Sequence, residues 1–89
     1  MLAQNYPNPF NPATTISYTL TQPGNAVLRI YNTRGELVRT LAQGYHPAGH
    51  YSQVWDGLNA NGLQVSAGVY FYRLGIGKMV QARRMLLVK

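Results

Sequence analysis

The regular spacing of turn signals constrains the fold of this chain more than any other feature. Clusters of Gly, Pro and Asn interrupt the sequence about every 8–12 residues, which leaves little room for a long helix. Between these clusters apolar and polar residues alternate, as in strands with one buried face. The pattern predicts an all-β fold, a two-sheet antiparallel β-sandwich of about seven short strands.

Four segments carry the alternation most clearly. They are 14–20, 26–31, 51–55 and 69–74, with turns or loops expected at 22–25, 32–35, 45–49 and 56–62. In the first, Ile16, Tyr18 and Leu20 share one face. A further strand is expected within 78–89, where the apolar residues Val80, Ala82, Leu86 and Val88 stand at even-numbered positions.

Residues 33–43 carry conflicting signals. Thr33 and Glu36 have the spacing of a helix capping box, and Gly44 could end such a helix. Leu37, Val38, Leu41 and Ala42 would share one helical face. A helix of about eight residues is marginal by itself, however, and both neighbouring segments are predicted strands. We therefore predict a strand over residues 36–43, after the hairpin turn at 32–35.

Residues 1–13 differ from the rest of the chain. Pro7, Pro9 and Pro12 fix their own φ angles and push the preceding residues toward extended geometry. We expect a stiff, extended lead-in, anchored on the domain by Tyr6 and Phe10. Residues 14–89 would then form the sandwich itself.

The inventory of titratable groups argues against catalysis. Glu36 and Asp56 are the two acidic residues of the chain, and both stand beside predicted turns. A glycosidase would need them to converge on one sugar. No nucleophile-elbow pattern supports a serine hydrolase either. Nothing resembles a signal peptide, and no apolar run approaches the ~20 residues of a membrane span. We expect no enzyme.

No cofactor or metal is expected. His46 and His50 are four residues apart, but the intervening Pro47 and Gly49 forbid the helix that would align them. Residues 56–62 have a faint likeness to a calcium loop. An EF-hand pattern would, however, put glycines at the first and last ligand positions, so an Asx-rich turn is expected instead.

Charge and aromatic content each allow two interpretations. The net charge of +6 suits simple solubility, or attraction to an anionic surface or glycan; nucleic acid is not expected. Seven Tyr residues and Trp55 could build the core and its rim, or a platform on which sugars stack. We expect the core, where a buried Trp55 should be essential for stability.

Three stretches resemble a known family. The run from Gln4 to Pro12, with Pro7, Asn8 and Pro9 at its centre, is similar to the start of type A C-terminal sorting domains of type IX secretion. The strand that opens with Gly68 and includes Tyr70 resembles that family's Gly-x-Tyr motif. The basic and apolar ending, 84–89, resembles its terminal strand.

The resemblance implies a function. Such a domain is joined to an N-terminal cargo domain, is recognised by the outer-membrane translocon, and is removed by a sortase-like peptidase that links the cargo to anionic lipopolysaccharide. The implied recognition residues here are Arg84, Leu86, Leu87 and Lys89. The parent protein would be secreted, or held at the outer surface of a Gram-negative bacterium.

Two other functions remain open. The stretch from Trp55 to Tyr70 is also similar to the Ig-like domain of flagellar hook-capping proteins. That resemblance implies that the predicted sandwich is immunoglobulin-like, and it implies a structural or assembly role. A carbohydrate-binding module of a secreted hydrolase is the third hypothesis. A terminal strand over 78–88 left at a sheet edge could pair with a translocon receptor or with a second copy, which would make a dimer.

Overall fold

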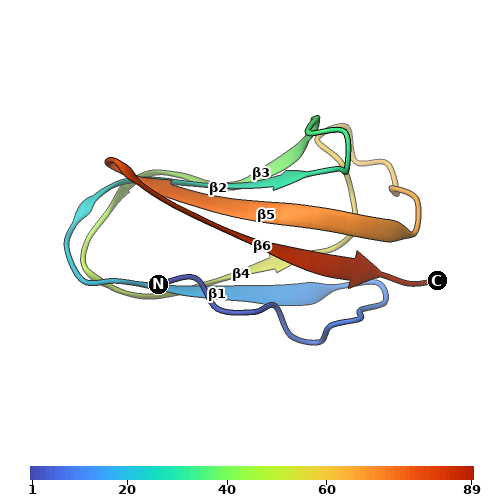
Figure 1. Cartoon of the computed structure of the whole chain (residues 1–89), viewed down its shortest axis with the longest axis horizontal. Coiled ribbons are helices and arrows are strands. Elements are labelled where there is room, and N and C mark those ends of the chain that lie inside the picture. Colours follow the sequence, from blue (N-terminus) through green and yellow to red (C-terminus); the bar gives the residue numbers. More distant parts are fainter.

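The computed structural model describes residues 1–89 and is an antiparallel sandwich of two sheets (Figure 1). Its strands are β1 (Thr14–Leu20), β2 (Gly24–Tyr31), β3 (Leu37–His46), β4 (Gly49–Trp55), β5 (Gly68–Ile76) and β6 (Met79–Leu87). The smaller sheet pairs β1 with β4, and the larger has the order β3-β2-β5-β6. The predicted all-β sandwich is confirmed, with six strands in place of about seven.

Several strands are longer than predicted. β3 continues to His46, so only Pro47 and Ala48 remain of the loop expected at 45–49. β5 continues to Ile76, and Gly77 with Lys78 makes the turn into β6. Between β4 and β5 the chain forms one isolated bridge, Leu58 with Gln64, because the turn-forming residues around it leave no run long enough for a strand.

The ambiguous segment after Thr33 is a strand, as predicted. β3 pairs along its length with β2, and the Asn32 side chain closes the hairpin turn by accepting the N–H groups of Arg34 and Glu36. The Glu36 carboxylate accepts the Asn32 amide at 2.8 Å, so it does not cap a helix. Pairing with a neighbouring strand outweighs the local helical signal.

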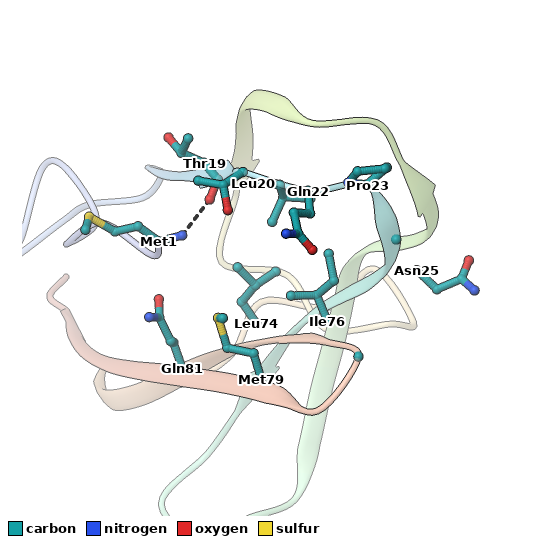
Figure 2. A pocket seen from close by; sticks show the side chains of 13 residues that line it. Met1, Thr19, Leu20, Gln22, Pro23, Asn25, Leu74, Ile76, Met79 and Gln81 are labelled. Atoms are coloured by element: carbon teal, nitrogen blue, oxygen red, sulfur yellow. Dashed lines mark hydrogen bonds between the residues drawn. The ribbon is translucent and has the colours of Figure 1, made fainter.

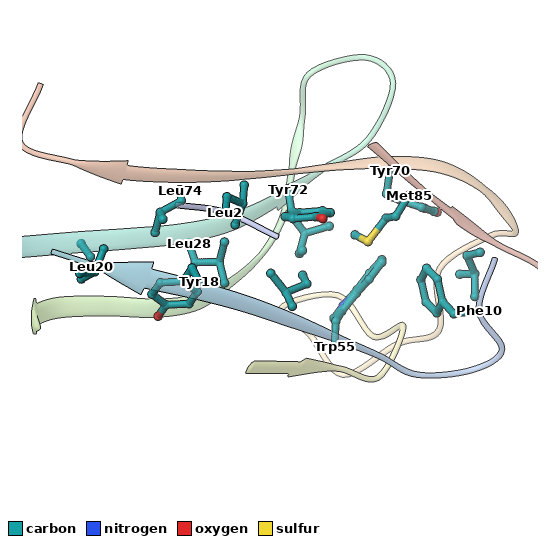
Figure 3. Close-up of a cluster of buried hydrophobic side chains, with 14 residues drawn as sticks. Leu2, Phe10, Tyr18, Leu20, Leu28, Trp55, Tyr70, Tyr72, Leu74 and Met85 are labelled. Carbon is teal, nitrogen blue, oxygen red and sulfur yellow. The ribbon is translucent and has the colours of Figure 1, made fainter. Parts of the chain in front are cut away.

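The core lies between the two sheets (Figure 3). The predicted inward faces of β1 and β2 are buried, and Trp55 is completely enclosed. Its ring lies 5.7 Å from that of Phe10 and 5.2 Å from that of Tyr70, an aromatic cluster at one end of the core. The interpretation of the aromatic residues as core is confirmed for Trp55, Tyr18, Tyr70 and Tyr72.

In β6 the buried side chains stand at odd-numbered positions, whereas most of the apolar residues noted in the sequence stand at even-numbered positions. Met85 and Leu87 are buried, whereas Val80, Ala82, Leu86 and Val88 are exposed. Antiparallel pairing places Met85 opposite Tyr70 and Leu87 opposite Gly68, so the register with β5 decides which residues face the core.

The structure contains no helix, and accordingly none that could cross a membrane.

Candidate functional site

The lead-in, residues 1–13, hydrogen-bonds to both sheets. Along β1, the N–H of Ala3 donates to Ser17 O, and Tyr6 exchanges two backbone bonds of 2.9 Å with Thr15. Further on, the chain leaves β1 and reaches β6, where Phe10 forms a parallel bridge with Leu87. The lead-in therefore closes the open side of the sandwich between β1 and β6 (Figure 1).

The exposed edge of β6 is the surface to which the lead-in binds. Leu86 donates its N–H to the Asn8 side chain and accepts the N–H of Phe10, each at 3.0 Å. Val88 donates to Phe10 O at 3.0 Å, and the Gln4 amide donates to Arg84 O. The lead-in thus already pairs the C=O of Arg84, both backbone groups of Leu86 and the N–H of Val88 on this edge.

A second set of contacts ties the start of the lead-in to the side chains of β6. Leu2 donates its N–H to the Gln81 carbonyl oxygen at 2.7 Å and accepts a bond from Arg83 Nε at 2.8 Å. Leu2 itself is buried in the core. Gln81 and Arg83 have the same strand parity as the buried Met85 but are exposed, so these bonds tie the lead-in to β6 beside the core.

A buried polar network holds the middle of the lead-in. Asn5 donates its N–H to the Tyr72 hydroxyl at 2.8 Å and its side-chain amide to Thr14 Oγ1 and Pro7 O. Tyr72 in turn donates to Ala3 O at 2.7 Å. Burial raises the pKa of Tyr72, and the Asn5 hydrogen bond and the charge of Arg83 partly oppose that rise.

The two expected aromatic anchors of the lead-in differ. Phe10 is buried and packs on Trp55, as predicted, but Tyr6 is 80% exposed, so its assignment as an anchor is wrong. Leu2 and Asn5 hold the segment in its place, and neither was predicted. No regular alternation runs through the segment: Leu2 and Phe10 are buried, whereas Tyr6 between them is exposed. A Leu at position 2 and an Asn before the Tyr-Pro step are weak signals of burial as long as the pairing of the lead-in with β1 is unknown.

The four implied recognition residues do not form one cluster. Leu87 is buried in the core, whereas Leu86 is partly exposed on the outer face of the larger sheet. Arg84 is exposed on that same face, and Lys89 is exposed just beyond the strand. Three of the four residues are therefore available to a partner in the folded domain.

The Gly-x-Tyr motif occupies the start of β5. Tyr70 is buried against Trp55 and donates its hydroxyl to Ser66 O at 2.6 Å, and burial raises the pKa of that phenol. Gly68 has φ 147°, in the region that favours glycine, and opens the strand. Both residues act in building the sandwich.

The acidic and histidine side chains are dispersed. Asp56 binds Arg39 at 2.7 Å and accepts the N–H of Leu58, and Glu36 binds Asn32. In the loop that resembled a calcium site, Asn59 Oδ1 accepts two backbone N–H groups, as in an Asx turn. No three His, Cys, Asp or Glu side chains come together.

A hollow of about 520 Å³ lies at the end of the sandwich where β1 turns into β2 (Figure 2). Leu20, Leu74, Ile76 and Met79 supply its apolar lining, and the side chains of Gln22 and Gln81 its polar atoms. It contains no acidic, basic or histidine side chain, and the N-terminal amino group of Met1 donates a hydrogen bond to Thr19 O in its lining.

Two antiparallel sheets packed around a single tryptophan-centred core, with a lead-in that contacts both, define an immunoglobulin-like β-sandwich domain. The chain matches the FlgD Ig-like domain family over residues 10–74, and it belongs to that family. No curated protein matches the sequence.

Solved structures share the fold. Dimeric latent PorU from Porphyromonas gingivalis is 22% identical, with a TM-score of 0.74 over 96% of this chain and 9% of its own. PorZ from the same organism is also 22% identical, with a TM-score of 0.65 over 97% of this chain and 11% of its own. FlgD from Xanthomonas campestris is 22% identical, with a TM-score of 0.66 over 96% of this chain and 64% of its own.

At this level of identity the likeness extends to the fold alone. The chain spans about a tenth of PorU and of PorZ, and less than two thirds of FlgD.

Proposed function

We propose that the chain is a C-terminal sorting domain that directs a larger exported protein through the type IX translocon to the cell surface. One observation carries the proposal. The FlgD-type family match covers residues 10–74 and leaves out most of the lead-in and all of β6. These are the segments that carry the first and last sorting motifs, and they bind one another through Asn8, Phe10 and Leu86.

The comparison with larger proteins supports the same proposal. This fold recurs as about a tenth of PorU and of PorZ, and PorZ is described as an essential surface component of the type-IX secretion system. Both likenesses extend over 96–97% of the present chain, so they include the lead-in and β6. A small, non-catalytic module attached to a larger exported partner is consistent with this arrangement.

The proposed recognition surface is β6 and the residues after it. Arg84 and Lys89 provide exposed positive charge that would steer an encounter with the translocon, and Leu86 provides apolar contact. The backbone groups of Val80 and Ala82 make no bond to the lead-in, so this half of the edge is open to pairing with a receptor strand. Leu87 would contribute by holding β6 in the fold.

The proposal has further parts. The partners are the translocon, a sortase-like peptidase that removes the domain, and a covalently linked N-terminal cargo domain. The cargo would be secreted or held at the outer-membrane surface of a Gram-negative bacterium. If a second copy pairs with β6, it can do so only along the open half of this edge, because the lead-in occupies the other half.

The test is export of a fluorescent protein fused ahead of this domain in a type IX-competent host. Deleting residues 85–89 would remove Met85 and Leu87 from the core, so lost export could reflect unfolding. The sharper variant is Arg84→Gln with Lys89→Gln. Its matched control is Arg34→Gln with Lys78→Gln, which removes the same charge from two exposed turn positions.

We expect the Arg84/Lys89 variant to export at most about a tenth of the reporter, with an unchanged melting curve, and the Arg34/Lys78 variant to export normally. Normal export of the Arg84/Lys89 variant would overturn the proposed recognition surface. Absence of export for the unchanged domain would overturn the sorting function as a whole.

A structural or assembly role of the hook-capping type is the second candidate, and the family match over residues 10–74 favours it. It predicts no export of the fused reporter. The carbohydrate-binding hypothesis loses its main residue, because Trp55 is enclosed in the core and cannot stack on a sugar.

A further inference from the structure

Two arginines stand side by side in the middle of the larger sheet, on its outer face. Arg29 of β2 and Arg73 of β5 are directly opposed in the antiparallel register. Like charges in directly opposed positions destabilise a sheet. The two arginines are next to each other although the chain has eight basic residues and much exposed surface on which to separate them.

Neither arginine has an acidic partner. The single salt bridge of the molecule joins Arg39 to Asp56, and the other acid, Glu36, binds Asn32 in the hairpin turn. Arg73 instead donates to the Tyr31 hydroxyl at 3.1 Å, with its guanidinium 5.1 Å from the centre of that ring.

Arg29 carries the clearest unmet requirement. Its Nε is buried and has no hydrogen-bond partner in the protein. A buried donor of this kind attached to a charged group is costly. Solubility would be served equally well by a fully exposed cation, so it does not account for a half-buried arginine with an unpaired donor.

A hollow of about 440 Å³ lies beside the pair. Both arginines line it, together with Asn25, Val27, Gly75, Gly77 and Val80. Gly75 leaves open space at its Cα, because a Cβ built there would meet no atom within 4 Å. Arg73 pairs with Ala82, so Arg84, two residues further along β6, stands diagonally across from Arg73. Arg84 therefore adds positive charge to the same face of the sheet.

We propose that Arg29 and Arg73 form a binding site for one oxyanion group, a carboxylate or a phosphate, in this hollow. Guanidinium groups bind such groups through paired N–H donors, and an anion between them would relieve their mutual repulsion. Because the Arg29 Nε is enclosed in the free chain, it can also donate to the anion only if the guanidinium turns toward the hollow. The site lies on the outer face of the sheet, and it does not depend on the proposed export function.

The test is an NMR titration of the ¹⁵N-labelled chain with inorganic phosphate and, separately, with acetate, at constant ionic strength. We expect a saturable shift of the Arg29 Nε–H signal and of the backbone amides near Gly75. The anion that binds more tightly identifies the group that the site selects. A fully linear response to both anions would overturn the proposal.

Two variants make the test specific. Arg29→Gln is expected to weaken binding by about tenfold or more, whereas Arg34→Gln, which removes the same charge from an exposed turn, should change it less than about twofold. Equal weakening in the two variants would show that only net charge attracts the anion, and would overturn the site. Arg29→Lys keeps the charge but removes the paired donors, so unchanged binding in that variant would also contradict the proposal.

Because binding is measured on the isolated chain and export in cells, the two proposals can fail separately. A domain that binds no anion but exports its reporter would remove this site and leave the sorting function standing.

Discussion

Replacing Phe10 by alanine tests whether the lead-in is part of the fold or only a tether. The Phe10 ring is 1% exposed and lies against Trp55. Removing a buried phenyl ring forfeits about 1.5–3 kcal/mol of transfer free energy, and the cavity raises the loss to about 3–5 kcal/mol. A chain of this size has a free energy of unfolding of about 4–13 kcal/mol. Phe10→Ala should therefore remove about a quarter of it or more.

The assay is urea unfolding followed by fluorescence of Trp55, the only tryptophan. The matched control is Tyr6→Ala, because Tyr6 belongs to the same segment but is 80% exposed. Its loss should be within about 0.5 kcal/mol. A loss below about 1 kcal/mol for Phe10→Ala, or equal losses for the two variants, would refute the conclusion that the lead-in is packed as an integral part of the sandwich.

Three further predictions concern the polar network, a turn and pH. Tyr72→Phe should cost about 1–3 kcal/mol in urea unfolding, because it leaves the buried N–H of Asn5 without an acceptor; a loss equal to that of an exposed Tyr→Phe variant would contradict the network. Gly57→Ala should cost more than Gly62→Ala, since both have φ near +80° but only Gly57 would bring a Cβ within 3.2 Å of Pro12 O; equal melting temperatures would argue against this contact. Burial raises three phenol pKa values above 10.0: those of Tyr18, Tyr70 and Tyr72. The unfolded chain loses these protons first, so the free energy of unfolding should be unaffected by them below pH 10 and fall as the pH rises above it; a stability that is flat or rising over pH 10–12 would be the contrary result.

The fold class could be predicted from local signals. Alternation along β1, β2 and β5 marks one face of each strand for burial, and such a face needs a second layer to cover it. The Gly- and Asn-rich turns limit the length of each element. The predicted burial of Trp55 followed from the same reasoning, because large aromatic rings contribute most to a thin core. Phe10 was predicted only as an anchor of the lead-in together with Tyr6, and of these two Phe10 alone is buried.

Residues 33–43 and β6 show where local signals fail. A capping-box spacing at Thr33 and Glu36 favours helix, yet β3 forms because β2 offers a full ladder of backbone hydrogen bonds. In β6, the even-numbered apolar row outnumbers the buried pair Met85 and Leu87. The pairing with β5 sets the parity, and a shift of one residue would exchange the two faces.

The candidate sites depend still more on tertiary structure. The residues of the sorting motif were visible in the sequence. Their contact with β6 was not, because Asn8 and Phe10 bind an edge that lies about 78 positions away along the chain. Likewise, the position of Arg29 opposite Arg73 follows only from the β2–β5 register. The sequence by itself determined which residues prefer burial and where the chain turns, because these are properties of single side chains and short segments. The tertiary structure alone decided which strands meet and in what register, because those contacts join residues that are distant along the chain.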